Sequence, residues 1–438
     1  MPILYNVNDH VPAGRSFLYS LQWLAFNLVN VSVVPIVVGA ALGLDQAGIA
    51  GLTQRVMFFA SLASILQIMF GHRLPIIEGP AGMWWGIFVT LGIMAPAMGK
   101  DLAVLRSDLE GGMLVAGLVL VILGYTGLMS KALKLFTPAV TGTVLVLLAL
   151  QLSGSFVRGM LGITGSDGAI DFQSLVVSLL VITTVIVVNL KARGFIRSLA
   201  ILIGTVVGWI TAAIIGISPE ISISTVSVEL PPLLAWGTPT FDPAITLISI
   251  LTGILVLSNS VASVLAMERT LEIKIPKKNH DKGVAFTGIG DILSGLGATI
   301  GLVPYSASAG LVSLTGVGAK GPFILFSVIM MLMGVIPAIA GFLSSIPAPV
   351  GYAVLLASFC QMLGFGLQDY ARLNMAGRTI FVIGIPVLVG TGIFTLPSTA
   401  FSTLPDWLRY IFSNGFLAGM LLCILCEHVL LPKKYFGD

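Results

Sequence analysis

Two carboxylates stand inside otherwise apolar stretches of this chain, and acids in such places are candidates for ion chemistry. Glu78 precedes a Gly79-Pro80 break, and Asp291 lies in a glycine-rich run. A buried acid is costly unless it takes up a proton or finds a partner, so we expect either residue to bind a proton or a cation. Two structural roles are the alternatives. Glu78 could pair with Arg73, and Asp291 could accept hydrogen bonds from backbone amides of neighbouring half-helices.

Polar side chains also form two stripes at helical spacing. Trp23, Asn27 and Asn30 fall at i, i+4 and i+7, and Asn259 and Ser263 at i and i+4, so each set shares one helix face. Side-chain amides offer paired donors and acceptors that suit a planar amide, such as the edge of a nucleobase. The alternative is that these side chains join helices to each other by hydrogen bonds.

Two short segments interrupt the apolar pattern. The stronger break is Pro304-Tyr305-Ser306-Ala307-Ser308-Ala309-Gly310, and the other is Gly79-Pro80 ahead of Gly82, Met83 and Trp84-Trp85. A membrane tolerates irregular backbone only where protein or a water-lined cavity satisfies its polar groups, so we expect substrate to bind at 304–310. Trp84 or Met83 would lie against a flat ring, with core packing more expected of Trp85 and an interfacial belt as the alternative.

The composition indicates the environment that surrounds these residues. The chain has 438 residues, of which 56% are hydrophobic and 9% charged, and its mean hydropathy is +1.03. One soluble domain could not cover so much apolar surface, so the sequence predicts an all-α polytopic membrane protein in a lipid bilayer. The net charge of +3 fits loop anchors, and no nucleic-acid partner is expected.

Cysteine usage and the rest of the polar inventory argue against a cofactor. Cys360, Cys423 and Cys426 are too few for a disulfide framework, and Cys423-x-x-Cys426-Glu427-His428 lacks a second group of metal ligands. We expect no metal and no other cofactor. Paired catalytic carboxylates and a nucleophile with its base are missing from the spans, which argues against an enzyme. The polar start up to Arg15 leads directly into an apolar run, so we expect the first helix to be its own insertion signal.

Apolar segments of about 20 residues, the length that crosses a bilayer, recur along the chain. The sequence predicts fourteen, with seven on each side of the polar stretch 218–241. Their approximate ranges are 17–40, 47–70, 79–98, 111–130, 137–160, 172–190, 197–217, 243–267, 283–301, 304–317, 321–343, 348–366, 377–397 and 407–431.

The positions of lysine and arginine agree with this count. With the N-terminus inside, the predicted outer side keeps only Arg55, Lys100, Arg106, Arg158 and Arg409. Because lysine and arginine collect in cytoplasmic loops, both termini are expected in the cytoplasm and the chain in the plasma membrane.

Seven spans per half mean that the second half enters the membrane in the opposite direction, which is the geometry of an inverted repeat. Three faint sequence matches between the halves agree with it. They are 138–142 with 347–351, 78–83 with 306–311, and Asn30 with Asn259.

The run Ala307-Ser308-Ala309-Gly310-Leu311-Val312-Ser313-Leu314-Thr315-Gly316 resembles the signature of the nucleobase/ascorbate transporter family. That signature is an acid, Gln or Pro, then Asn-x-Gly-x4-Thr, then Arg, Lys or Gly. Gly310, Thr315 and Gly316 fit, whereas Ala307 and Ser308 depart from it. Further support comes from Leu21-Gln22-Trp23 with Val34-Pro35 and from Leu74-Pro75 with Gly79. The similarity runs along nearly the whole chain and points to a divergent bacterial branch of purine and uracil/xanthine permeases.

The resemblance implies two inverted seven-helix repeats with short extended pieces in spans three and ten. It assigns 1–134 and 243–345 to a core domain with spans 1–4 and 8–11. It assigns 135–218 and 346–438 to a gate domain. Family members take up a nucleobase with a proton or sodium ion as the core moves against the gate, and a homodimer through the gate domain is compatible with this arrangement.

The resemblance also implies which residues meet the substrate. Positions that are ionisable in uracil permease are neutral here, which leaves ion coupling to Glu78 or Asp291; these positions are Trp23, Asn259, Ser263 and Ala307. Tyr305 lies where the family has a tyrosine that contacts substrate through its backbone.

Two functional hypotheses follow. The first is secondary active uptake of a purine or pyrimidine base such as xanthine or uracil, with Asn259 reading the amide edge and backbone groups of Tyr305 to Ser308 completing the pocket. The second is an anion transporter or channel of the same inverted-repeat fold, with the ion held between half-helix N-termini. We expect it less, because no Arg or Lys lies in the broken segments.

Overall fold

The computed structural model describes residues 3–97, 99–128, 133–163, 168–219, 227–375, 377–401, 403–405, 408–409 and 412–431. The prediction that both termini are cytoplasmic falls partly on residues 1–2 and 432–438, which lie outside these ranges.

Helices make up most of the described chain, in agreement with its composition. Among the described residues, eight helices are long and apolar enough to cross a membrane: α1 (Ala13–Ala41), α2 (Gln46–Met69), α4 (Leu102–Thr126), α6 (Pro138–Met160), α7 (Phe172–Lys191), α10 (Pro243–Leu271), α15 (Ala348–Ala371) and α16 (Gly377–Phe394). The chain is therefore a multi-pass helical protein, and the count of fourteen spans stays a prediction.

The other predicted spans contain helices as well. These are α3 (Gly82–Ala97), α8 (Gly194–Ser198), α9 (Ala200–Ile215), α11 (Lys277–Leu296), α12 (Ala307–Thr315), α13 (Lys320–Met333), α14 (Pro337–Ser344) and α18 (Gly415–Leu425), which continues as a π-helical turn, Cys426–Leu430. Two short 3₁₀ turns, Leu133–Leu135 and Ser398–Phe401, lie between helices.

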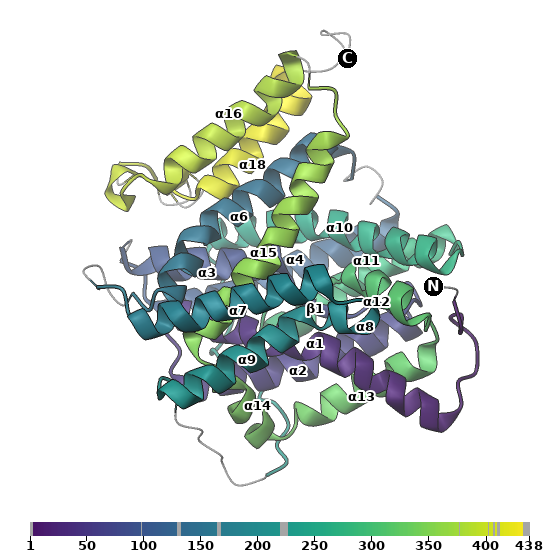
Figure 1. The fold of residues 1–438 in the computed structure, drawn as a ribbon. Coiled ribbons are helices and arrows are strands. Elements are labelled where there is room, and N and C mark those ends of the chain that lie inside the picture. Colours follow the sequence, from purple (N-terminus) through teal and green to yellow (C-terminus); the bar gives the residue numbers. More distant parts are fainter. Residues whose placement is uncertain are drawn as a thin grey trace.

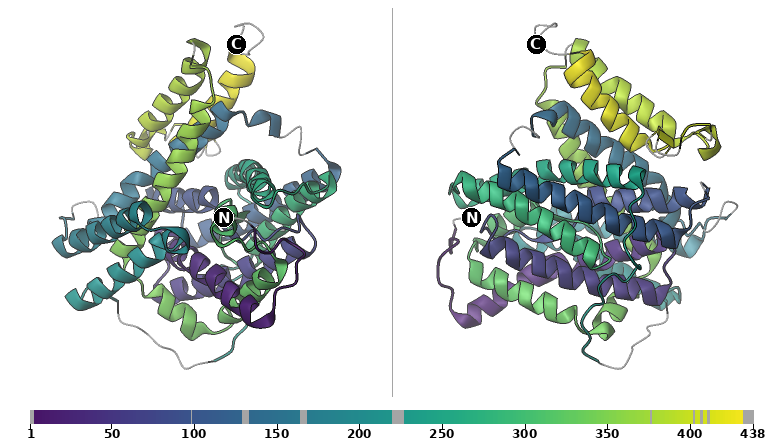
Figure 2. Two further views of the ribbon diagram at one scale, coloured as in Figure 1. Left: turned by 45° about the vertical axis from the view of Figure 1, so that its right-hand side comes forward. Right: turned by 180° about the vertical axis from the view of Figure 1, so that it is seen from behind.

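One group of helices packs around α4. Helices α10 and α11 lie along α4, and α2 contacts α1, α11 and α13 (Figure 2). Glycine allows the close approach: a Cβ added to Gly117 would lie 2.5 Å from the carbonyl oxygen of Gly288, and one added to Gly124 would lie 2.5 Å from the amide nitrogen of Ala285. Helices without bulky side chains at the contact can pack backbone to backbone in a membrane.

A second group packs around α6 and α15. Helix α6 begins at Pro138, and α15 begins directly after Pro347, so the two proline-led segments that resemble each other in sequence both start helices. The two helices lie against each other at Gly142 and Gly366. Helices α7 and α9 cover one side of α15, and α16 and α18 extend from α6 to one end of the molecule (Figure 1).

Two three-residue strands connect the halves of the first group. Strand β1 (Glu78–Pro80) pairs antiparallel with β2 (Leu302–Pro304), with Glu78 opposite Pro304 and Pro80 opposite Leu302. All six residues are buried. Helix α3 begins shortly after β1 and α12 shortly after β2, so the prediction of short extended pieces in spans three and ten is confirmed.

The break itself lies earlier than predicted. The sequence placed irregular backbone at 304–310, but the extended part is Leu302–Pro304 and α12 already begins at Ala307. Ala307, Ser308 and Ala309 have no residue type that resists a helix once Pro304 has ended the strand. Each strand precedes a helix, so β1 (Glu78–Pro80) corresponds to β2 (Leu302–Pro304), and the proposed match of 78–83 with 306–311 is displaced from the strands.

Predicted span eleven is bent rather than straight. Helices α13 and α14 meet at 89°. Gly334 ends α13, and Pro337 begins α14, where its missing N–H and fixed φ suit a first turn but not the interior of one continuous helix.

Candidate substrate cavity and ion site

A cavity of about 750 Å³ lies between the two helix groups. Helices α1, α10 and α12 and the residues beside the strands form one wall, and α7, α8, α9 and α15 form the other. Its polar lining residues include Asn30, Asn259, Ser306, Ser313, Asn189, Arg197, Ser198, Ser358 and Gln361. No Asp or Glu is among its described lining residues. An apolar cavity with a few convergent polar groups suits a small planar ligand.

The two predicted amide stripes meet at this cavity through one residue each. Asn30 on α1 and Asn259 on α10 both line it and are half-buried, so their amides are accessible from the cavity. The remaining members of the stripes are buried and do not line it. Trp23 packs edge-on against Phe323, with ring centroids 5.1 Å apart, and Asn27 is 2% exposed.

The start of α12 supplies backbone donors to the cavity. Among the described residues, the N–H groups of Ser306 and Ala307 donate to no protein acceptor, and both residues line the cavity. The backbone of Tyr305 is already occupied, because its N–H donates to Ile77 O at 2.8 Å and its carbonyl accepts from Ser308 N at 3.0 Å. The backbone role that the resemblance gives to Tyr305 therefore fits the next two residues better.

The side chain of Tyr305 instead forms part of the cavity floor. Its hydroxyl donates to Pro80 O at 3.0 Å, and its ring lies so close to Gly79 that a Cβ there would be 2.5 Å from Tyr305 Cζ. Glu78 is near enough to interact electrostatically with the phenol. Glycine at position 79 thus lets the aromatic ring lie flat across β1, between the cavity and the buried acid.

Ser263 and Ser308 hold the strands rather than face the cavity. Ser263 Oγ donates to Pro304 O at 2.6 Å, and Ser308 Oγ accepts from Ile77 N at 3.1 Å. Both serines are at most 1% exposed and neither lines the cavity. They fix the backbone from which the ligand-facing groups project.

The ring-facing positions after β1 differ from the expectation. Trp84 is fully buried and packs on Gly301 and Phe88, and Met83 is 7% exposed; neither lines the cavity. Gly82 does not line it either. Trp85 lines the cavity instead, and its ring lies 4.7 Å from that of Phe359. Neighbouring side chains on a helix point about 100° apart, so only one of the two tryptophans can face the cavity. The sequence alone did not show which one.

Glu78 and Asp291 lie together beneath the strand pair. Asp291 Oδ1 accepts from Leu302 N at 3.0 Å, and Glu78 N donates to Ser64 Oγ at 2.9 Å. The two carboxyls interact electrostatically and are 1% and 0% exposed. Both oxygens of Glu78 and Oδ2 of Asp291 have no hydrogen-bond partner, and Gln67 and Trp84 are the polar neighbours.

This arrangement decides between the structural alternatives for the two acids. Within the described residues no salt bridge reaches either carboxyl, so the pairing of Glu78 with the exposed Arg73 is wrong. Asp291 does accept a backbone amide, as its structural alternative predicted, but with one oxygen only. Three unpartnered carboxylate oxygens at one buried place can hold a proton or a small cation.

Sequence reasoning missed most of the second wall. Arg197, Asn189, Gln361 and Met362 line the cavity from helices that were assigned no ligand contact. Gln361 in an apolar span was the available signal, since an amide there needs a partner. Arg197 stands at the predicted boundary between the spans 172–190 and 197–217, and no pattern there indicated that α8 would reach the cavity.

The second wall is joined to the first by a hydrogen bond at another place. Gln151 Nε2 on α6 donates to Thr90 Oγ1 on α3 at 2.6 Å, and Gln151 Oε1 accepts from Phe416 N at 3.0 Å. A smaller cavity of about 330 Å³ borders these residues. The two helix groups thus meet on both sides of the large cavity, at α3 and α6 and again where α8 contacts α12.

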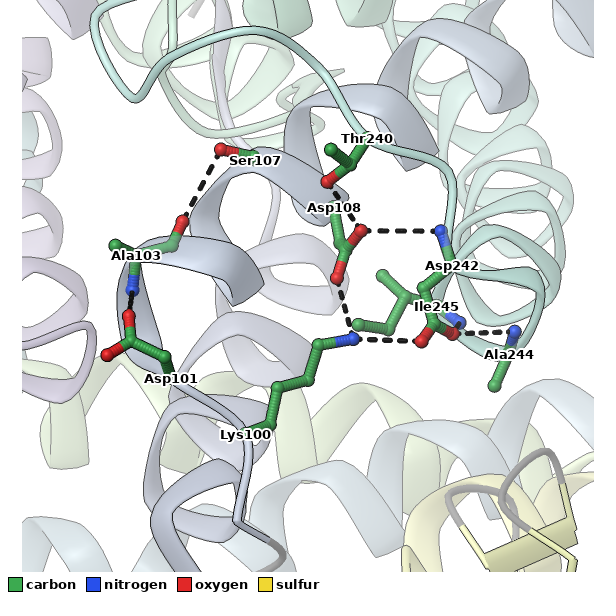
Figure 3. Close-up of polar contacts among 9 residues, drawn as sticks. All are labelled: Lys100, Asp101, Ala103, Ser107, Asp108, Thr240, Asp242, Ala244 and Ile245. Carbon is green, nitrogen blue, oxygen red and sulfur yellow. Dashed lines mark hydrogen bonds and ion pairs between the residues drawn. The ribbon is translucent and has the colours of Figure 1, made fainter.

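A separate charged cluster stands where α4 and α10 begin (Figure 3). Lys100 Nζ lies 2.6 Å from Asp108 Oδ2 and 2.9 Å from Asp242 Oδ2, and Thr240 Oγ1 donates to Asp108 Oδ1 at 2.6 Å. Asp242 also accepts from the N–H groups of Ala244 and Ile245 and so caps α10. The cluster ties the loop before α4 to the start of α10.

Three or more His, Cys, Asp or Glu side chains do not gather as a metal site in the described part of the chain. Cys423 and Cys426 are buried free thiols of α18 and its π-helical turn. Glu427 in the same turn instead accepts from Arg378 Nη2 at 2.7 Å.

The arrangement of the helices is one that solved structures share. It is similar to the transmembrane domain of a cyanobacterium bicarbonate transporter, BicA, with a TM-score of 0.60 and 14% identity over 92% of this chain and 97% of that chain. It is also similar to the murine Slc26a9 anion transporter in the inward-facing state, with a TM-score of 0.63 and 11% identity over 96% of this chain and 69% of that chain.

Sequence comparison gives the family. Residues 14–399 match the model of the Permease family (Xan_ur_permease), and the chain belongs to this family. "Putative purine permease YwdJ" of Bacillus subtilis (strain 168) is 32% identical over 96% of this chain and 97% of that protein. The xanthine permease of the same organism is 25% identical over 95% of this chain and 94% of its own length, and its uric acid permease PucK is 26% identical over 94% of each.

Proposed function

We propose that this protein takes up a purine or pyrimidine base, such as xanthine, uracil or a related oxidised purine, by secondary active transport. The observation that carries the proposal is the cavity between the two helix groups, which is lined by Asn30 and Asn259 and by the start of α12 with its free N–H groups. These groups can read the alternating donors and acceptors on the edge of a base. The relatives named for purine, xanthine and uric acid transport agree with this substrate class.

Aromatic and apolar residues would hold the faces of the base. Trp85 and Phe359 line the cavity with Met362, so a flat heterocycle can pack against a ring and a thioether there. Asn259 reads the edge, and Ser306 and Ala307 donate backbone hydrogen bonds. Because the two walls belong to different helix groups, separation of the groups would release the base.

The transport cycle in this proposal moves the two helix groups against each other. The core domain is 1–134 with 243–345, the gate domain is 135–218 with 346–438, and the fourteen spans place both termini in the cytoplasm of a bacterium. The cavity reaches α8, which the charge pattern places on the cytoplasmic side, and the bond from Gln151 to Thr90 joins core to gate elsewhere.

Coupling in this proposal uses Glu78 and Asp291. Their unpartnered oxygens lie beneath β1 and β2, the strands that also shape the cavity floor, so binding of a proton or sodium ion there can act on the base site through Tyr305. The family's ionisable positions on spans eight and ten are Asn259 and Ala307 here, which leaves Glu78 and Asp291 as the acids at the strand pair.

Binding and uptake of radiolabelled bases test the proposal. Purified protein should gain thermal stability with xanthine, uric acid or uracil, since a ligand of the native state stabilises it in proportion to its saturation. Asn259→Ala should abolish this gain, whereas Ser258→Ala on the same helix, outside the cavity lining, should keep it. If no base stabilises the wild-type protein, the proposal is wrong.

A second candidate is transport of a small anion. Arg197 places a cation on the cavity wall, and the two structural relatives above are named for bicarbonate and anion transport. Currents or fluxes that depend on chloride or bicarbonate, in protein that binds no base, would favour it. A protonophore that leaves base accumulation unchanged would instead remove proton coupling from the first proposal.

A further inference from the structure

Arg197 is the one cation among the described residues that line the cavity. It belongs to α8, the five-residue helix between α7 and α9, and α8 lies against α12. The guanidinium is therefore carried by the second helix group, across the cavity from the first. No described lining residue is an acid, so the field of this cation inside the cavity is not cancelled there.

The side chain is oriented by a single neighbour. Arg197 Nε donates to Asn189 Oδ1 at 3.3 Å, and Asn189 lines the cavity as well. This is the one hydrogen bond of Arg197 within the described part of the chain, so both terminal nitrogens are free to bind a ligand. A guanidinium fixed through Nε presents its two Nη groups as a planar fork, which matches a planar anion with two acceptor atoms.

Resting on the proposed function, we propose that Arg197 makes the cavity selective for the anionic form of acidic oxopurines, held between the guanidinium and the N–H groups of Ser306 and Ala307. Purines with several ring carbonyl groups lose a ring proton near neutral pH, and the charge then spreads over adjacent nitrogen and oxygen atoms in the plane of the ring. Such an anion offers the guanidinium fork two acceptors side by side. Bases without this acidity stay neutral and gain nothing from the cation.

The position of Arg197 also makes its selectivity depend on how the two helix groups are arranged. The residue moves with the gate, whereas Asn259 and α12 belong to the core, so the anion is bound by both groups only when the cavity is arranged as in this structure. Arg197 is exposed, so its attraction is screened by water and salt, and its contribution is that of one or two charge-assisted hydrogen bonds.

Binding of three purines to purified full-length protein tests this assignment. The probes are xanthine and uric acid, which are acidic, and hypoxanthine, which is neutral at the same pH. Arg197→Gln should weaken the binding of xanthine and uric acid by about tenfold, the equivalent of one charge-assisted hydrogen bond. The affinity for hypoxanthine should change by less than about twofold. Arg197→Lys, which keeps the charge without the fork, should recover part of the loss for the acidic bases.

Arg193→Gln is the matched control, because Arg193 is the exposed N-cap of the same helix and lies outside the cavity lining. It should leave all three affinities unchanged. Equal losses for acidic and neutral bases in Arg197→Gln, or the same selective loss in Arg193→Gln, would overturn the role of Arg197. Absence of binding of every base to the wild-type protein would instead refute the proposed function, so the two failures are distinguishable.

Discussion

Asp108 and Asp242 share the ammonium group of Lys100, whereas Glu78 and Asp291 face each other beneath the strand pair without a described cation. Both pairs are acids in a mostly apolar protein, but they differ in how their charge is compensated. In the first pair the charge is compensated and each acid also accepts other hydrogen bonds. In the second pair three oxygens have no partner.

The difference indicates which acids can change charge during transport. Lys100 compensates the charge of Asp108 and Asp242, so these two acids anchor the start of two helices (Figure 3). A fully buried carboxyl without a cation is stable only when it carries a proton or binds an ion. The Glu78 and Asp291 pair therefore fits the proposed ion site, whereas the Lys100 cluster fits a fixed anchor.

The largest expected effect comes from removing the charge of the uncompensated pair. Glu78→Gln should bring the accumulation ratio of a labelled base down to about one, because the amide cannot take up or release a proton or hold a cation. Base binding should stay within about twofold of wild type, since Glu78 does not line the cavity. Uptake into energised vesicles and binding to purified protein measure the two quantities.

Asp108→Asn serves as the comparison for that variant, because it neutralises an acid that already has a cation. Its accumulation ratio should remain close to that of the wild type. If Asp108→Asn abolishes accumulation and Glu78→Gln does not, the assignment of the two pairs is reversed.

Removing the cation of the anchor should affect stability rather than coupling. Lys100→Met leaves Asp108 and Asp242 close together without a counter-charge and should lower the free energy of unfolding by about 2 kcal/mol, less than for a fully buried pair because Lys100 is partly exposed. The midpoint of thermal unfolding in detergent should fall by a few degrees. Unchanged stability would show that the cluster is not an anchor.

A smaller effect is expected at the polar neighbour of Asp291. Trp84→Phe removes an indole N–H that interacts with Asp291 and leaves an aromatic side chain in its place. Base accumulation should fall about two- to threefold, equivalent to less than 1 kcal/mol, with binding unchanged. Trp85→Phe should show the reverse pattern, since Trp85 lines the cavity and Trp84 does not. Equal effects of the two variants on binding would contradict this separation.

The smallest expected effect is the pH dependence of the anchor. Burial opposes the charge of Lys100, but hydrogen bonds with Asp108 and Asp242 outweigh it and raise its pKa above 10.5. Burial likewise opposes the charge of Asp242, but Lys100 and the N–H groups of α10 lower its pKa below 3.8. The contribution of Lys100 to stability is fully present below pH 10.5 and is lost as the pH rises through its raised pKa. The contribution of Asp242 to stability is fully present above pH 3.8 and is lost as the pH falls through its lowered pKa.

The stability difference between wild type and Asp242→Asn should therefore be constant between about pH 5 and 9. Thermal unfolding at several pH values measures it. A difference that changes across neutral pH would mean that the anchor titrates in the physiological range and resembles the buried pair.

Much of the fold was predictable because hydrophobic length and proline placement act locally. The long apolar runs gave the helices, and Pro138 and Pro347 gave the starts of α6 and α15. Glu78 and Asp291 stood out because a charge in an apolar run is costly wherever the chain goes. The matches between Asn30 and Asn259 and between the two breaks indicated that distant segments share one place.

Tertiary structure decided which side of each helix meets the cavity and what covers each acid. Adjacent tryptophans differ only in the direction in which they leave α3, so Trp85 rather than Trp84 lines the cavity. Arg197 reaches it because α8 interrupts two helices and packs on α12, a contact between segments more than a hundred residues apart. Composition and spacing alone determined a polytopic helical membrane protein with two unusual acids, and the resemblance of its motifs pointed to a permease. The pairing of β1 with β2 brought those acids together, because register between distant strands depends on the packing of the whole chain.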